Sequence, residues 1–143
     1  VRTFVDDVSL YYESQGQFCY RVEAVEGLNA YGFSETSFSN AVCATIDPLV
    51  YIPNAFMIRG ENPIFLPVIS LYDFDSYNLS IYSRWGEEIF NTLNRDEGWN
   101  GENTTFGGYH EEGVYVYFLR FKDREGNDYE YRGTVTLLIG GGQ

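Results

Sequence analysis

The chain has 143 residues, 44 % of them hydrophobic and 18 % aromatic, which is enough apolar surface for a packed core and argues against disorder. Its 21 acidic and 9 basic residues give a net charge of −12, so nucleic acids and anionic membrane surfaces are not expected partners. No run of about 18 apolar residues occurs, so no membrane-spanning helix is expected. The apolar residues are mainly aromatic and β-branched and never repeat at helical spacing, which predicts a nearly all-β protein.

Residues 1–47 are predicted to contain a strand, a turn, a second strand, a loop and a third strand. Apolar and polar residues alternate in the segment GQFCYRVEAVEG, which predicts a strand with one buried face. This segment and the following SNAVCATI are similar to the end of a fibronectin type III domain, although Phe18 replaces the usual corner tyrosine. Three strands leave one face of a sandwich uncovered. Residues 1–47 are therefore expected to be the last strands of such a domain, within the C-terminal piece of a longer protein.

Cys19 and Cys43 lie on the two strands that are expected to pair. Residues directly opposed in such a pair have Cα atoms about 4.5–5.5 Å apart, which a disulfide can span. A disulfide is predicted, and two buried free thiols are the alternative. The bridge would stabilise the protein by roughly 3 kcal/mol in the chain-entropy model and would indicate an oxidising compartment.

A second domain is expected over residues 48–139, after a short linker at Asp47-Pro48. Its predicted fold is an immunoglobulin-like antiparallel β-sandwich, with tight turns at Trp85-Gly86 and at 125–127. The expected strands are 50–53, 64–70, 77–84, 88–92, 113–122 and 129–139. The tail at 140–143, GGGQ, offers little to pack and is expected to be flexible or the remnant of a linker.

Four motifs follow one another in this second domain. They read IYSRWGEEIF from Ile81, WNG from Trp99, GVYVY from Gly113 and GTVTL from Gly133. Together they resemble the type B sorting domain at the C-terminus of gliding-motility-associated surface proteins, which are substrates of the type IX secretion system. The family's opening element is present only in part, as IPNAF, because MIRGENP replaces the Asn/Asp/Gly-rich loop that follows it.

The resemblance implies that the domain is a C-terminal secretion signal recognised in folded form. Proteins of this kind cross the inner membrane by a signal peptide, fold in the periplasm, and leave through a very large outer-membrane barrel with the help of a shuttle protein. Barrel and shuttle are therefore the expected partners, and the cell surface or the medium is the expected location. Such a role requires no chemistry on the chain, and neither a cofactor nor a metal is expected.

The surface that the exporter reads is expected to include a hairpin turn. Arg84 offers a planar donor fork beside the indole of Trp85, and both residue types are enriched at interface hot spots. Alternatively Trp85 caps the core with Arg84 stacked on it, the tyrosines pack in the core, and the glycines serve as turn or bulge positions. The last strand is a further candidate, because an unpaired edge can join a partner's sheet. The expected partner-binding residues are Arg84, Trp85, Gly86, Tyr115, Tyr117, Gly133, Val135 and Leu137.

An enzyme is not expected. His110, the single histidine, lies in the segment GGYHEEG and is expected to be a solvated loop residue rather than a general base. The acidic clusters around Asp73 and within 96–112 lack the spacing of a calcium loop. The rival hypothesis is a carbohydrate-binding or adhesion β-sandwich module, in which Trp99 or Tyr109 stacks on sugar rings. A structural spacer is a third possibility.

Overall fold

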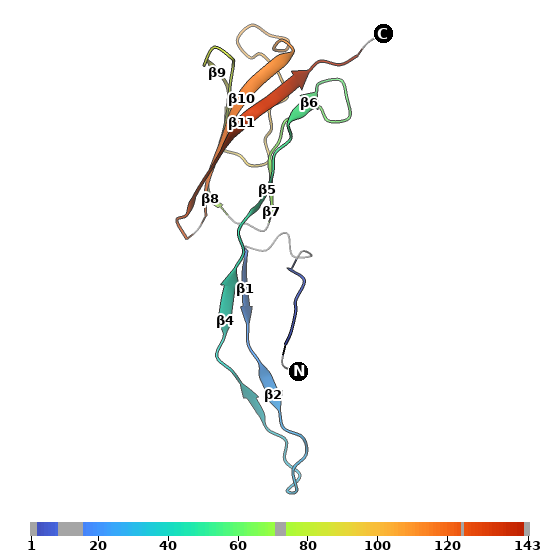
Figure 1. Ribbon diagram of the computed structural model, residues 1–143, viewed down its shortest axis with the longest axis vertical. Helices are drawn as coiled ribbons and strands as arrows, with labels where there is room; N and C mark the ends of the chain where they lie inside the picture. Colours follow the sequence, from blue (N-terminus) through green and yellow to red (C-terminus); the bar gives the residue numbers. More distant parts are fainter. Residues whose placement is uncertain (1–2, 9–15, 71–73, 124, 142–143) are drawn as a thin grey trace.

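The structure, a computed structural model, describes residues 3–8, 16–70, 74–123 and 125–141. These residues form eleven β-strands and no α-helix, which confirms the predicted all-β class. Figure 1 shows a narrow arm built from the first four strands and, beyond it, a sandwich that contains the other seven.

The arm is a long antiparallel β-hairpin. Strand β1 pairs with β4, and β2 pairs with β3. Between the two pairs, the backbone N–H of Ser39 donates to the carbonyl of Val22, whose own N–H donates to Ser39 Oγ, both at 2.8 Å. The strands are β1 (Gln17–Tyr20), β2 (Glu23–Val25), β3 (Thr36–Phe38) and β4 (Val42–Thr45).

The apolar face of this arm is open, so the prediction of a buried face is wrong. Val22 and Val25 are 69 % and 66 % exposed, and Phe38 is 53 % exposed. The physical reason is that two strands cannot cover their own faces, and no second sheet lies over them among the described residues.

A five-stranded sheet forms the larger layer of the sandwich, in the order β6-β11-β10-β8-β9. Its strands are β6 (Ala55–Met57), β8 (Phe74–Tyr82), β9 (Glu88–Thr92), β10 (Gly113–Asp123) and β11 (Asp128–Leu138). Alternate residues of the long strands point to one face and build the core, as the period of a β-strand requires. The sandwich prediction is thereby confirmed.

The smaller layer consists of β5 (Leu49–Tyr51) paired with β7 (Val68–Ser70), extended by loop residues. Phe65 and Trp99 form an isolated antiparallel bridge, with backbone N–H groups donating in both directions at 2.8 and 2.9 Å. The Trp99 ring centroid lies 5.2 Å from that of Phe56 on β6. The buried core residues are Phe56, Phe65, Ile69, Tyr77, Leu79, Ile81, Trp99, Tyr115, Leu119, Phe121, Val135 and Leu137.

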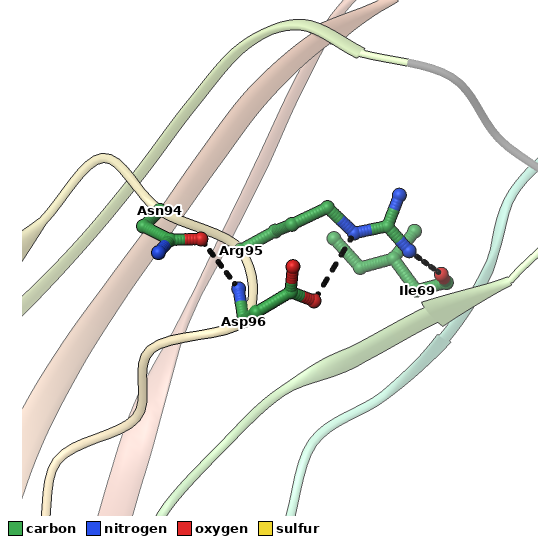
Figure 2. A network of polar contacts seen from close by, with 4 residues as sticks. All are labelled: Ile69, Asn94, Arg95 and Asp96. Carbon is green, nitrogen blue, oxygen red and sulfur yellow. Dashed lines mark hydrogen bonds and ion pairs between the residues drawn. The ribbon is translucent and has the colours of Figure 1, made fainter.

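Arg95 links the loop after β9 to the smaller layer (Figure 2). Its Nη2 donates to the carbonyl of Ile69 on β7 at 3.5 Å, and its Nε lies 4.0 Å from the carboxylate of Asp96. The backbone N–H of Asp96 donates to Asn94 Oδ1 at 3.0 Å, which fixes the turn. The two layers are thus joined by polar contacts at their margin as well as by the apolar core.

The predicted strand at 64–70 is wrong over its first half. Phe65 forms only the bridge, and regular pairing is confined to β7. Pro63 and Pro67 flank this stretch and lack the N–H that a ladder needs. Strand β9 has the predicted limits, and β8, β10 and β11 differ from prediction by a few residues at their ends.

Strand β6 was not predicted, and it changes the environment of the last strand. It pairs in parallel with β11, with Ala55, Phe56 and Met57 opposite residues 136–138. The sheet is therefore not wholly antiparallel, and the predicted free edge is wrong for residues 136–138. Beyond the strand, Gly140 packs against the side chain of Met57, while residues 142–143 of the predicted flexible tail lie outside the described residues.

Candidate functional site

The turn between β8 and β9 is closed by its own hydrogen bonds. The backbone N–H of Ser83 donates to the carbonyl of Glu87 at 2.8 Å, and that of Gly86 donates to the carbonyl of Ser83 at 3.0 Å. Ser83 Oγ accepts from the N–H groups of Trp85 and Glu87, both at 3.3 Å. Gly86 has a φ of +84°, a conformation that glycine adopts without strain. These bonds fix the backbone of the turn, which carries the side chain of residue 85.

Trp85 projects from this turn into solvent. Its side chain is 86 % exposed, so the alternative in which it caps the core is wrong. Arg84 Cζ lies 5.8 Å from the centroid of the indole, within the range of a cation–π contact. The turn thus presents an aromatic ring and a guanidinium together at the end of the sandwich.

A second rigid loop lies beside this turn, between Trp99 and β10. Asn103 Oδ1 accepts from the N–H groups of Thr105 and Phe106, both at 3.0 Å. The backbone N–H of Asn103 donates to the carbonyl of Gly108, and that of Gly107 donates to the carbonyl of Asn103. Phe106 stands at the tip of this loop and is 89 % exposed.

A cleft of about 490 Å³ separates the turn from the loop. Aromatic side chains contribute to its wall, namely Trp85, Phe106 and Tyr109. Three carboxylates also line it, those of Glu87, Glu88 and Glu111. No cleft was predicted at this position; Phe106 and Tyr109, the two aromatic residues of the Gly- and Asn-rich loop, are the signal that could have drawn attention to that loop.

His110 lies at the inner side of the cleft. Its ring centroid is 6.0 Å from that of Trp99 and 6.1 Å from that of Tyr115. Burial lowers the pKa of His110 below its usual value, while the nearby Glu87 acts in the opposite direction. The imidazole is accordingly neutral at pH 7, and the residue is half-buried rather than fully solvated as predicted.

Three of the expected partner-binding residues lie in the core. Val135 and Leu137 are fully buried, and Tyr115 is 8 % exposed with its hydroxyl donating to the carbonyl of Glu111 at 2.7 Å. The side chains of Val135 and Leu137 pack between the layers, and Tyr115 packs beside them with an edge that lines the cleft. Arg84, Trp85 and Gly86 are the expected residues that are exposed.

Gly133 is opposite Tyr117 in the β10–β11 pair, in the middle of a regular strand. A Cβ at position 133 would lie 2.6 Å from the tyrosine hydroxyl oxygen, so the missing side chain makes room for the ring. The prediction of a turn or bulge with positive φ is therefore wrong for Gly133. Tyr117 is half-buried and packs against the core.

The predicted disulfide is confirmed. Cys19 on β1 and Cys43 on β4 are directly opposed, with Cα atoms 4.0 Å apart, and their sulfur atoms are bonded. Both cysteines of the chain are used in this bridge.

The described residues contain no group of three or more His, Cys, Asp or Glu side chains placed to hold a metal ion; Asp73, from one predicted acidic cluster, lies outside them. Nor do they contain a helix long and apolar enough to cross a membrane.

The sandwich matches a known protein family. The model of the CHU_C type IX secretion signal domain matches residues 50–137, which is more than half of the chain and coincides with the sandwich. No curated protein matches the chain. A type IX secretion signal marks proteins that are exported to the cell surface or secreted, and the family is not an enzymatic one. The chain belongs to the CHU_C family of type IX secretion signal domains.

Proposed function

We propose that the type IX translocon reads residues 48–139 as a folded domain, through its outer-membrane barrel and the associated shuttle protein. The observation that carries this proposal is the agreement between the family match and the sandwich, since the matched segment contains the whole buried core. A preassembled core gives unrelated cargo proteins one common surface. Residues 1–47 are then the end of a preceding fibronectin-like domain.

The exposed turn at Arg84, Trp85 and Gly86 is the part of the expected surface that a partner could contact directly. Tryptophan and arginine are the residue types most enriched at interface hot spots. Tyr115, Tyr117, Gly133, Val135 and Leu137 would act from beneath, by fixing the strands that carry this surface. The chain would contribute no catalysis and hold no cofactor.

A pair of matched substitutions tests whether the folded form is required. Leu119 is fully buried, so Leu119→Asp places an unpaired charge in the core and should unfold the domain. Leu93 is 73 % exposed, so Leu93→Asp should leave it folded. With residues 48–139 fused to a periplasmic reporter, we expect export of the wild type and of Leu93→Asp, and periplasmic retention of Leu119→Asp. Equal export of all three fusions would contradict recognition of the folded domain.

One of the two residues named in the rival carbohydrate-binding hypothesis is buried. Trp99 is 1 % exposed and packs against Phe56 and Tyr115, so it offers no face to a sugar ring. Tyr109 is half exposed and lines the cleft.

A further inference from the structure

The cleft carries aromatic side chains that the fold does not use. Trp85 and Phe106 stand on opposite sides of it and are 86 % and 89 % exposed, so neither contributes to the core. Two large exposed aromatic residues beside one cleft are typical of an interaction surface rather than of a solvated loop.

The two sides of the cleft are fixed before any partner arrives. Ser83 and Asn103 each accept two backbone N–H groups of their own turn, and cross-turn backbone bonds complete both loops. A partner would therefore lose little binding free energy to ordering of these loops, which is the advantage of preorganisation.

The electrostatics of the cleft favour a cation. Glu87, Glu88 and Glu111 line it, against the single guanidinium of Arg84, and His110 adds no charge at neutral pH. Within the part of the chain that the structure describes, none of the three carboxylates forms an ion pair; Glu88 instead accepts a hydrogen bond from the Tyr82 hydroxyl.

We propose that this cleft binds an extended protein segment that presents lysine or arginine beside aromatic or aliphatic side chains. The inference rests on the proposed function, and it names the chemistry of the translocon segment that would recognise the domain. The aromatic walls would take the apolar side chains, and the carboxylates would pair with the basic ones. A neutral glycan could stack on the same rings, but it would leave the three carboxylates uncompensated.

Binding of short fluorescent peptides to the full chain tests the proposal. The probe is a hexapeptide of alternating lysine and phenylalanine, compared with the same peptide carrying glutamate in place of lysine and with cellohexaose. We expect the lysine peptide to bind, more weakly at high salt, and the other two probes not to bind.

Matched variants locate that binding. Trp85→Ala with Phe106→Ala, and separately E87Q with E88Q and E111Q, should each weaken it about tenfold or more. The controls alter exposed residues away from the cleft: Tyr31→Ala in the arm with Tyr51→Ala on β5, and E23Q with E26Q and E35Q in the arm. The controls should bind as the wild type does. An equal loss in the charge control, or binding of cellohexaose alone, would overturn the proposal.

Export of the reporter fusion separates this inference from the proposed function. If the wild-type fusion is exported and the cleft variants are exported equally well, the cleft is not the recognition surface, although the sorting role stands. If the wild-type fusion is not exported, the sorting role of residues 48–139 is refuted. The proposal that a segment of the translocon occupies the cleft is then refuted as well.

Discussion

Gly98 is a single residue on which the closure of the core depends. A Cβ at this position would lie 2.6 Å from the carbonyl oxygen of Phe65 and would clash with the side chain of Ile64. Because the Phe65–Trp99 bridge holds that backbone in place, Gly98→Ala should reduce the free energy of unfolding by about 1–3 kcal/mol.

Chemical denaturation measures this change. Gly27→Ala is the control, since no atom lies within 4 Å of a Cβ at that position and its effect should be small. Equal stabilities of the two variants would show that the segment around Phe65 can move aside.

Buried tyrosines make the stability depend on alkaline pH. Burial raises the pKa of Tyr77 to about 12, although the nearby Arg95 lowers it in part, and burial also raises the pKa of Tyr115 and of Tyr117. These hydroxyls hold their protons more tightly in the folded state. Their contribution to the free energy of unfolding is therefore complete below pH 10 and is lost as the pH rises toward 12.

The melting temperature should therefore fall between pH 10 and pH 12. Tyr77→Phe removes one titrating group and should show a smaller fall, whereas replacement of the exposed Tyr51 by phenylalanine should change nothing. Melting curves at several pH values, with phenolate absorbance as the probe of titration, check this. Identical pH profiles for wild type and Tyr77→Phe would contradict it.

Residue roles were predicted less well from the sequence than residue positions. The motif around Trp85 correctly predicted a turn. The same residues are compatible with an exposed indole and with one that caps the core, because the exposure of Trp85 depends on the loop that lies opposite. Val135 and Leu137 alternate with threonines on a strand, a pattern that itself predicts burial. The role of Gly133 follows only from its register opposite Tyr117.

The arm and the sandwich should respond differently to loss of the Cys19–Cys43 disulfide. The disulfide spans a sequence separation of 24 residues, and a loop of this length is stabilised by roughly 3 kcal/mol. No strand pairing joins the arm to the sandwich in the described ranges. Replacement of both cysteines by serine should therefore speed amide exchange in β1 and β4 by roughly 100-fold and leave β10 unaffected.

Hydrogen exchange followed by mass spectrometry measures both regions in one experiment. Equal loss of protection in β10 would mean that the two parts unfold together.

The long strands of the sandwich were predictable because their alternation is regular and glycine turns bound them. Strand β6 was not, since three residues in a Pro- and Asn-rich stretch give no periodic signal, and their parallel pairing with β11 is a long-range contact. The bond between Cys19 and Cys43 was predicted because the two residues were expected on paired strands, where directly opposed Cα atoms lie within reach of a disulfide.

For the whole molecule, the function was predicted from the family resemblance, and the fold was predicted from composition and the alternation of apolar and polar residues. Charge and composition argue against nucleic acids and anionic membranes as partners, but they do not distinguish a secretion signal domain from a binding module. The cleft between the 83–87 turn and the 103–108 loop depends on two segments meeting across the sandwich end, which no local pattern encodes.

The location of the parent protein with and without residues 48–139 tests the central claim most directly. Surface protease treatment of intact cells, followed by immunoblotting of surface and periplasmic fractions, measures it. If the folded sandwich is the label that the translocon reads, the truncated protein accumulates in the periplasm while the intact protein reaches the surface. Surface display of the truncated protein at the level of the intact one would contradict the account.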